Sequence, residues 1–325
     1  MLFDLLNRIE GDLGVHFASL SAHSVVYKVQ GTVEILRRYY PELRDPHYAS
    51  TVTLGHARYS TNTNPVFERA QPFGLLGHNG EFNTISRFRM EAGMLGVDLS
   101  PNNSDSQDVD RFAHALCAKF GFDLIEAMTY IFPPFEHDLP AESAGMREAV
   151  DEVRRTFGPF AQGPAAVAAR YADLCVFSVD ALGLRPLWFG ETDKEYFASS
   201  ERGVYTLDSM IRDAKPLAPG EKIALRVKRG QPIEVYDYPA VLRHVYSRHR
   251  ERLGQSTNGG TRATGEHLTL EDFVPPSPHP SPTGGTAISP ATAPTLTLER
   301  IESGVALAEA ARPGRGRATA LRSIR

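Results

Sequence analysis

The sequence predicts an α+β fold with mainly antiparallel sheets, because strand-like segments come first, helical segments follow and strand-like segments return. The first strand-like segment is FASLSAHSVVYKV, at residues 17–29, in which β-branched and aromatic residues are frequent up to Gly31. Apolar residues recur at helical spacing in the middle of the chain, and strand-like patterns return from residue 164. The links between segments are short, which argues against parallel strands joined by crossover helices.

The N-terminal part predicts one helix and two further strands. Residues 1–13 form an amphipathic pattern whose apolar face contains Leu2, Leu5, Leu6, Ile9 and Leu13. The segments TVTLGHARYS (51–60) and FGLLGH (73–78) are typical of strands. Polar, turn-forming residues follow each of them, first STNTNP and then Asn79-Gly80.

Three helices and a run of strands are expected after the turn at Asn79-Gly80. The helices are predicted over residues 104–120, 123–132 and 142–157; the first begins with Ser and Asp as capping residues. The strands that follow are expected in GPAAVAARY, DLCVFSVD, RPLWFG and EYFASS. The segment KIALRVKRGQPIEVYDY predicts a hairpin with its turn at Arg229-Gly230.

Composition limits the class of protein. The 325 residues are 42% hydrophobic and 23% charged, which is typical of a globular chain with one large or two small domains. The net charge of −4 gives no basic field for nucleic acid, and apolar runs are shorter than the ~18 residues of a membrane span. Cys117 and Cys175 are the two cysteines and have no metal-binding spacing. We therefore expect a cytoplasmic protein without metal or other cofactor, and with no nucleic-acid or membrane partner.

The composition changes after about residue 254. Residues 275–294 contain seven prolines among Ser, Thr, Gly and Ala, and such a segment buries too little apolar surface to offset its ordering entropy. The sequence therefore predicts a folded domain at 1–254 and a disordered tail at 255–325.

Five residues in three short segments have the chemistry to bind an amino acid. Arg58 can bind a carboxylate in bidentate fashion, with Thr61 as a hydrogen-bonding neighbour. The side-chain amide of Asn79 and the backbone N–H of Gly80 can donate to one oxygen, as in an oxyanion hole. Asp105 can accept from an ammonium group. Together they indicate a site for an amino acid that carries a side-chain carbonyl.

Each of these residues also has a structural interpretation. Arg58 can be an ion-pair partner, Asp105 can cap the helix that follows it, and Asn79-Gly80 can be a plain turn. Residue chemistry alone leaves both interpretations open.

Several linked motifs resemble the glutamine amidotransferase domain of the glutamate synthase family. The segments HARYSTNTNP, RAQPFGLLGHNGEFNT and SDS are similar in order and spacing to that family's HxRFSTNT, AQPF, HNGEINT and SSDS. Upstream, SLSAHSVVYK is similar to SLSSRTIVYK. Downstream, DALGLRPLWFG, FASSERGV and LAPGEKIAL are similar to DRNGLRP, ASE and PGE. The resemblance covers about residues 18–228; DALGLRP departs from the family segment by losing two polar groups.

The resemblance implies a class-II glutamine amidotransferase of the N-terminal-nucleophile hydrolase type, with a four-layer α/β/β/α sandwich that is incomplete at its N-terminus. In that family Arg58 would bind the α-carboxylate of glutamine, Thr61 would assist, and Asp105 would bind the α-amine. Asn79 and Gly80 would form the oxyanion hole. Glutamine would be hydrolysed to glutamate and ammonia for a synthase partner. The segments STNT and AQPF argue against phosphoribosyl-pyrophosphate amidotransferase or asparagine synthetase.

The nucleophile of that family is missing from this sequence. The family uses an N-terminal cysteine whose own α-amine acts as base, whereas this sequence begins Met-Leu-Phe, and Cys117 and Cys175 both lie in apolar patterns. Three explanations stay open: a truncated reading of a longer protein, one half of a split enzyme with a complementing chain, or a silent glutamine-binding module. The first two are favoured because the five binding residues are present. The missing strands would leave sheet edges unpaired.

Overall fold

The computed structural model describes residues 2–57, 64–100, 102–135, 139, 144–158, 160–257 and 305–311. Its helices are α1 (Leu2–Leu13), α2 (Val33–Tyr39), α3 (Ile85–Met94), α4 (Asp105–Ala118), α5 (Leu124–Ile131), α6 (Ala144–Thr156) and α7 (Tyr238–Thr257). Its strands are β1 (Val52–His56), β2 (Leu76–Gly80), β3 (Ala165–Tyr171), β4 (Leu174–Val179), β5 (Trp188–Thr192), β6 (Glu195–Ser199), β7 (Met210–Pro216), β8 (Lys222–Arg226), β9 (Glu234–Tyr236) and β10 (Val305–Ala311).

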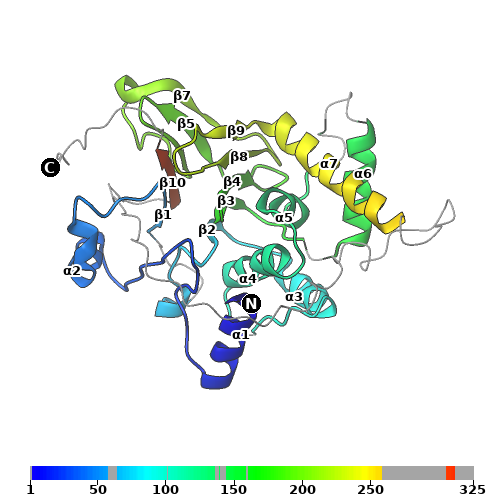
Figure 1. The fold of residues 1–325 in the computed structure, drawn as a ribbon, viewed down its shortest axis with the longest axis horizontal. Coiled ribbons are helices and arrows are strands. Elements are labelled where there is room, and N and C mark those ends of the chain that lie inside the picture. The colour runs from blue at the N-terminus through cyan, green and yellow to red at the C-terminus, as the bar shows by residue number, and fades with distance from the viewer. Residues whose placement is uncertain are drawn as a thin grey trace, which may run out of the picture.

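The strands form two sheets of five. The inner sheet has the order β2-β3-β4-β8-β9, and the outer sheet has the order β1-β10-β6-β5-β7. Every pair of neighbouring strands is antiparallel. In Figure 1, helices α5, α6 and α7 lie on the side of the inner sheet that faces away from β5 and β7. The predicted α+β class with antiparallel sheets is confirmed. The helices, the inner sheet and the outer sheet correspond to three of the four layers that the family resemblance implies.

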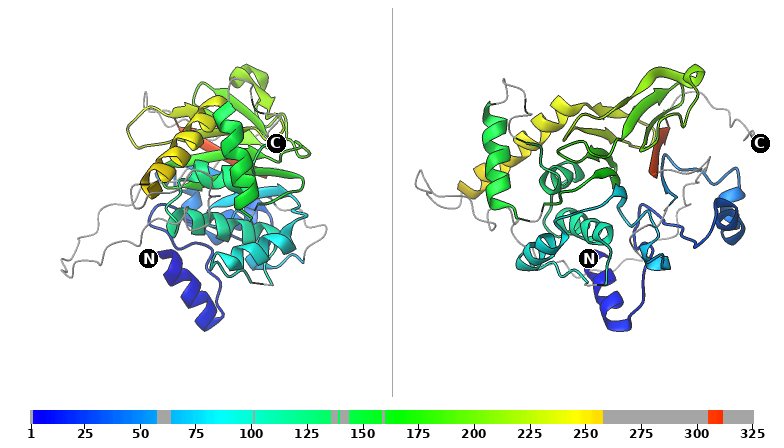
Figure 2. Two further views of the ribbon diagram at one scale, coloured as in Figure 1. Left: turned by 90° about the vertical axis from the view of Figure 1, so that its right-hand side faces the viewer. Right: turned by 180° about the vertical axis from the view of Figure 1, so that it is seen from behind.

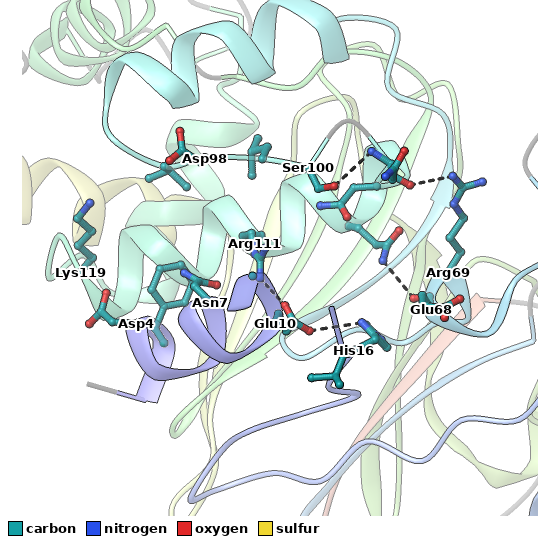
Figure 3. A pocket seen from close by; sticks show the side chains of 18 of the residues that line it. Asp4, Asn7, Glu10, His16, Glu68, Arg69, Asp98, Ser100, Arg111 and Lys119 are labelled. Carbon is teal, nitrogen blue, oxygen red and sulfur yellow. Dashed lines mark hydrogen bonds and ion pairs between the residues drawn. The ribbon is translucent and has the colours of Figure 1, made fainter. Parts of the chain in front are cut away.

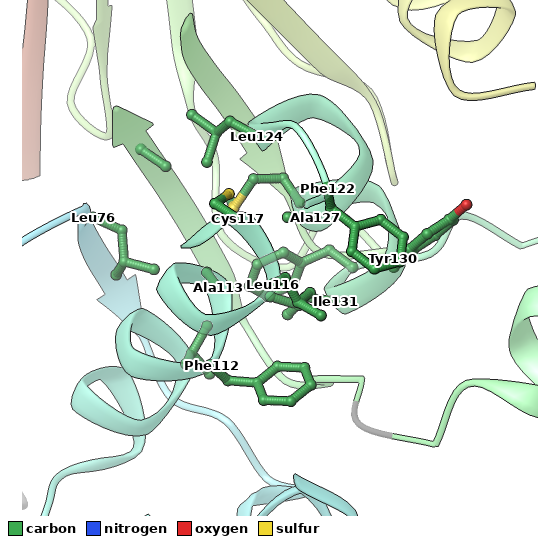
Figure 4. Close-up of a cluster of buried hydrophobic side chains, with 14 of the residues drawn as sticks. Leu76, Phe112, Ala113, Leu116, Cys117, Phe122, Leu124, Ala127, Tyr130 and Ile131 are labelled. Carbon is green, nitrogen blue, oxygen red and sulfur yellow. The ribbon is translucent and has the colours of Figure 1, made fainter. Parts of the chain in front are cut away.

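The inner sheet is buried on both faces, and β3 shows why. Its residues alternate: Val167 packs in the core under the helices, whereas Ala166 and Ala168 pack in the core between the two sheets. The helical core is built around α4 and α5, as Figure 4 shows for Phe112, Leu116 and their neighbours. Because β3 contributes to both cores and pairs with β2, it fixes the position of β2 in the inner sheet.

Helix α1 packs at one end of the molecule against α4. The ring of Phe3 lies 4.9 Å from the ring of His114, and the Arg111 guanidinium donates to Glu10 at 2.6 Å. Figure 2 shows α1 projecting from the body of the molecule in both views. None of the helices in the described ranges has the length and hydropathy needed to cross a bilayer.

The helix predicted at the N-terminus and those at α4, α5 and α6 are confirmed, but the strand predicted at residues 17–29 is wrong. That segment bonds to side chains rather than to a neighbouring strand: Val26 N–H donates to Ser19 Oγ, and Tyr40 Oη donates to the Lys28 carbonyl. Helices α2, α3 and α7 and strand β7 were not predicted.

The C-terminal region differs from the prediction in two places. Helix α7 continues to Thr257, and residues 305–311 form β10 within the range predicted to be disordered. The backbone of β10 pairs with β1 on one side and with β6 on the other, so this segment gains hydrogen bonds that an isolated tail lacks. The other tail residues lie outside the described ranges, and disorder there stays a prediction.

Candidate functional site

The end of β2 is formed by His78, Asn79 and Gly80, which pair with Val167, Ala166 and Ala165 of β3. Asn79-Gly80 is therefore the last part of a strand rather than a free turn beyond it. Gly80 has φ of 139°, and a Cβ there would lie 1.8 Å from the Pro164 carbonyl oxygen. Glycine is required at this position by both conformation and space.

Gly163, just before β3, makes a second close backbone contact, with the residues that follow β2. Gly163 has φ of 137°, and a Cβ there would lie 2.1 Å from the Glu81 carbonyl oxygen. The Glu81 N–H donates to the Pro164 carbonyl at 2.9 Å, and the Asn83 N–H donates to Gln162 at 2.7 Å. The backbone after β2 is thus fixed in one conformation by the backbone before β3.

The side chain of Asn79 contacts the end of β6 in the outer sheet. Its Nδ2 donates to Ser200 Oγ at 3.3 Å, and Ser200 is 2% exposed. An amide nitrogen carries two hydrogens, so one is directed to Ser200 and the other can donate to a ligand oxygen. This contact fixes the orientation of the amide that the oxyanion-hole assignment requires.

His78 is a structural residue beside this amide. Its Nδ1 lies 2.8 Å from Ser106 Oγ, and its ring stacks on Phe82 with 4.0 Å between centroids. Burial lowers the pKa of His78 to about 4, although the charge of Asp105 and the Pro164 carbonyl act in the opposite direction. The imidazole is therefore neutral near pH 7.

The exposed edge of β2 is closed by a glutamine side chain. The His78 N–H donates to Gln71 Oε1 at 2.7 Å, and Gln71 Nε2 donates to the His78 carbonyl at 3.0 Å. The ring Nε2 of His56, at the end of β1, also lies 3.0 Å from that carbonyl. This pairing explains why an AQPF segment accompanies the HNG segment, a connection that the sequence pattern did not show.

Asp105 lies at the first position of α4, next to the loop that follows Gly80. Its Oδ2 accepts from the Phe82 N–H at 2.9 Å, and its Oδ1 accepts from the Ser106 N–H at 2.7 Å. The helix cap itself is Ser104, which forms a reciprocal capping box with Gln107. Oδ1 also accepts from the Ser106 hydroxyl at 3.2 Å, whereas Oδ2 has room for a further hydrogen, so Asp105 both positions the loop and can receive an ammonium group.

Arg58 and Thr61 lie outside the described residues, and their predicted roles stay predictions. The structure does bring Asp105 to the loop after Asn79 and Gly80, and it brings the end of β1 to the same place through His56.

The sequence patterns did not indicate that the loop at residues 180–185 contacts the start of β3, next to the end of β2. The carboxylate of Asp180 accepts from the backbone N–H groups of Ala165, Leu182, Leu184 and Arg185 at 2.9–3.3 Å. Arg185 Nη2 donates to Glu201 at 3.3 Å, and its charge is among the causes that lower the pKa of His78. The DALGLRP motif could have indicated this loop, because its first and sixth residues are Asp180 and Arg185, which make these contacts.

Both cysteines are packing residues, as their sequence patterns predicted. Cys117 packs in the helical core and Cys175 in the core between the sheets. Burial raises the pKa of the Cys117 thiol, and it raises the pKa of the Cys175 thiol to about 12. Neither thiol is a nucleophile near neutral pH, since the thiolate is the reactive form.

Two cavities lie near these elements. One of about 1430 Å³ runs along β1 and reaches His56 and Gln71, but Asn79, Gly80 and Asp105 do not line it. Another of about 870 Å³ lies between α1 and the start of α4, where Glu10 contacts both Arg111 and His16 (Figure 3). No group of His, Cys, Asp or Glu side chains within the described ranges is arranged to hold a metal ion.

The chain belongs to the class-II glutamine amidotransferases, since the model of that family matches residues 5–238. Within that class it is similar to part of several glutamate synthases at about 30% identity. It is 32% identical over 240 residues to the chloroplastic ferredoxin-dependent glutamate synthase of Oryza sativa subsp. japonica, a match that covers 68% of this chain and 15% of the relative. It is 30% identical over 234 residues to the glutamate synthase [NADPH] large chain of Azospirillum brasilense, a match that covers 66% of this chain and 15% of the relative.

The chain thus spans a small part of the length of the curated relatives that it matches. Among solved structures, it is similar to an allosteric regulatory enzyme of purine biosynthesis with a TM-score of 0.37 and 17% identity, over 56% of this chain and 34% of that one. A glutamine phosphoribosylpyrophosphate amidotransferase from B. subtilis gives a TM-score of 0.34 and 18% identity, with the same coverage. With TM-scores and identities this low, neither structure supports a conclusion about this chain.

Proposed function

We propose that this chain is the glutamine-binding and oxyanion-stabilising component of a glutaminase, which hydrolyses glutamine to glutamate and ammonia for a synthase partner. The observation that carries the proposal is the fixed end of β2, where the Asn79 amide is oriented by Ser200 and the Gly80 backbone by Pro164. A preorganised pair of donors is what a tetrahedral intermediate of amide hydrolysis requires.

In the proposed reaction, each residue of the candidate site has one role. A thiolate attacks the side-chain carbonyl carbon of glutamine, and the carbonyl oxygen becomes an oxyanion that accepts from Asn79 Nδ2–H and the Gly80 N–H. Collapse of this intermediate breaks the C–N bond, releases ammonia and leaves a thioester. Water then attacks the thioester, which releases glutamate and restores the thiol. Removing one such donor typically costs about 2.7–4 kcal/mol of transition-state stabilisation. Asp105 receives the substrate's ammonium group, and Arg58 with Thr61 binds its carboxylate. His78 takes no part as an acid or base near pH 7, because its pKa is about 4.

The thiol comes from another segment, because Cys117 and Cys175 are buried. A thiol on an N-terminal residue has its own α-amine as the adjacent base, which accepts the proton and later delivers it to the leaving ammonia. The synthase partner is proposed from the relatives, of which this region is about 15%.

The experiment is complementation. The full chain is mixed with a fragment that begins with cysteine, and glutamate release from glutamine is measured. The mixture is expected to be active, and Asn79→Ala in the same mixture is expected to lower kcat by about 100-fold or more, with KM little changed. A complete reconstituted protein that binds glutamine but releases no glutamate would contradict the enzymatic proposal.

A second candidate, a silent module that binds glutamine, is favoured by the burial of both thiols. Calorimetric titration of the chain with glutamine distinguishes the silent module from the glutaminase component. A silent module binds glutamine without a fragment, loses binding in Arg58→Ala and keeps it in Asn79→Ala, because the oxyanion donor acts in the transition state.

A further inference from the structure

A third cavity, of about 440 Å³, lies between α1, α4 and the segment at residues 16–24, and we call it the Lys28 cavity. Glu10, His16 and Arg111 lie on its wall and also on the wall of the 870 Å³ cavity in Figure 3. The described residues of the candidate site do not line it. Its volume is within the range of small-molecule sites, about 300–1,000 Å³.

The wall of the Lys28 cavity changes from charged to apolar along α4. Asp110 is on the wall, and Cys117 follows on it two helical turns later, about 10.5 Å along the axis. Helix α1 shows the same change, because Glu10 pairs with Arg111 whereas Phe3 packs one turn further along α4. The cavity therefore has one charged end and one apolar end.

Lys28 is 3% exposed, and its ammonium group lacks a close acceptor in the described part of the chain. Its Nζ lies 3.4 Å from His16 Nε2 and 3.4 Å from the Glu68 carbonyl, and both distances exceed the about 2.7–3.2 Å of most such bonds. Burial lowers the pKa of Lys28 to about 8, against the charges of nearby carboxylates, so the group is a cation near pH 7. A buried cation in this position is stabilised by an anion that fills the cavity.

Asp110 has one carboxylate oxygen that is free to accept. Its Oδ1 accepts from the Leu75 and Leu76 N–H groups, both at 2.9 Å, and its Oδ2 has no donor among the described residues. This Oδ2 lies beside Gly74, another residue of the wall, where a Cβ would be 3.9 Å away. Burial raises the pKa of Asp110 to about 6, against the two hydrogen bonds, so the group is a carboxylate near pH 7. Asp110 and Lys28 are both described and form no ion pair, although each charge acts on the pKa of the other.

The other charged groups on the wall have partners. Glu10 binds Arg111 at 2.6 Å, and Arg170 donates to the His23 carbonyl at 3.3 Å. Burial lowers the pKa of His114 to about 4, so its ring is neutral near pH 7. The two groups left for a ligand are thus one cation and one anion, at the charged end of a cavity whose other end is apolar.

We propose that the Lys28 cavity binds a free α-amino acid with an apolar side chain. Lys28 receives its carboxylate, Asp110 Oδ2 accepts from its ammonium group, and its side chain lies at the apolar end near Cys117. Such a zwitterion brings no net charge into the cavity and gives each charged group the partner it lacks. Glutamine fits this cavity less well, because its side-chain amide would lose hydrogen bonds to water at the apolar end. Asp110 holds the start of β2 and Asn79 lies near its other end, so this is a second ligand site.

Isothermal titration calorimetry of the full chain with leucine and three analogues tests the site without any mutation. Leucine is expected to bind. Leucinamide lacks the carboxylate, N-acetylleucine lacks the ammonium group, and alanine lacks most of the apolar side chain; each is expected to bind at least about tenfold more weakly. Absence of leucine binding, or an affinity for any of the three analogues equal to that for leucine, overturns the inference.

Two variants assign the binding to the two charged groups. Lys28→Met and Asp110→Asn each remove one charge with little change of shape, and each should weaken leucine binding at least about tenfold. The amide in Asp110→Asn keeps an oxygen for the N–H groups of β2, and circular dichroism checks that both variants are folded. Lys194→Met and Asp193→Asn, at exposed positions between β5 and β6, are matched controls and should bind leucine as the wild type does. Wild-type affinity in both Lys28→Met and Asp110→Asn overturns the inference.

Asp105→Asn separates the Lys28 cavity from the candidate site. Asp105 does not line the Lys28 cavity, so this variant should bind leucine as the wild type does, while glutamine binding at the candidate site should weaken. Loss of leucine binding in Asp105→Asn together with wild-type binding in Asp110→Asn would place leucine in the candidate site and overturn the inference. Leucine binding that follows Asp110 and Lys28 stands whether or not the chain is part of a glutaminase.

Discussion

The two sheets differ in how firmly they position their share of the candidate site. On the inner sheet, the end of β2 is bonded to β3 along its whole length, to Gln71 at its edge and to Pro164 after it. On the outer sheet, β1 and β6 are joined through β10, whose ladder with β6 has two residue pairs. The first region is held by local, repeated contacts, and the second by a distant segment.

The proposed reaction requires a rigid position for the oxyanion donors, which lie on the inner sheet. Oxyanion donors must be held in place before the reaction, and the inner sheet holds Asn79 and Gly80 in this way. The predictions below test how firmly each of the two regions is held.

The largest effect is expected at Gly80. In Gly80→Ala the new Cβ would meet the Pro164 carbonyl at 1.8 Å in a backbone with φ of 139°. Strain and overpacking together should lower the free energy of unfolding by about 4 kcal/mol or more, measured by urea denaturation. Gly93→Ala is the control, because a Cβ there has open space within α3; it should raise stability by about 0.5–1 kcal/mol. Similar stabilities for the two variants would show that the β2 end is not rigid.

A comparable loss is expected in the helices that cover the inner sheet. Glu126 of α5 is fully buried, and Arg252 of α7 donates to both of its oxygens at 3.0 and 3.1 Å. Arg252→Ala leaves a buried carboxylate with less compensation and should cost about 3–4 kcal/mol. Arg250→Ala, at an exposed position of the same helix, should cost under about 0.5 kcal/mol. Thermal and urea unfolding of the two variants side by side would show whether this ion pair holds α5 to α7.

The sequence predicts the local part of this architecture and misses the long-range part. The periodicity of α4 and the alternation of β3 identify their buried faces correctly, because both depend on neighbouring residues. The strand predicted at 17–29 fails because its backbone bonds to the side chains of Ser19 and Tyr40, which propensity does not report.

The candidate site shows the same limit. Asn79-Gly80 and Asp105 are visible in short motifs, and the structure brings them together through the Phe82 N–H. The contact of Asn79 with Ser200 spans more than a hundred residues, and no local pattern indicates it. Strand β10 was missed for a related reason: its hydrogen-bonding partners, not its composition, make it a strand.

A pH-dependent prediction concerns Lys222, at the start of β8. It is fully buried and donates to the carbonyls of Phe132, just after α5, and Gly220, and burial lowers its pKa from 10.5 to about 7. Between these two values the unfolded chain binds a proton that the folded chain has lost, so this group makes stability rise with pH, by at most about 1.4 kcal/mol per unit. The effect is absent below pH 7, where both states are protonated, and above 10.5, where both are neutral.

The measurement is the difference in unfolding free energy between the wild type and Lys222→Met from pH 7 to 10, since the difference cancels other titrating groups. The wild type should gain on the variant as the pH rises. Lys215→Met, at an exposed position of β7, should track the wild type throughout. A flat difference for Lys222→Met would show that the amine keeps its proton in the folded protein.

The smallest change in overall stability is expected in the outer sheet. Ala310 lies opposite both Val52 and Tyr196, yet Ala310→Pro should lower the free energy of unfolding by less than about 1 kcal/mol, because a weakly paired segment opens locally without the rest of the fold. Val167→Pro, at the middle of β3, should cost about 3 kcal/mol or more, because proline there removes a ladder hydrogen bond between two buried cores. Hydrogen exchange checks the same point without mutation: amides of residues 305–311 should exchange far faster than those of β3. Equal protection of the two strands would show that the outer sheet is held as firmly as the inner sheet, which would contradict the difference drawn between them.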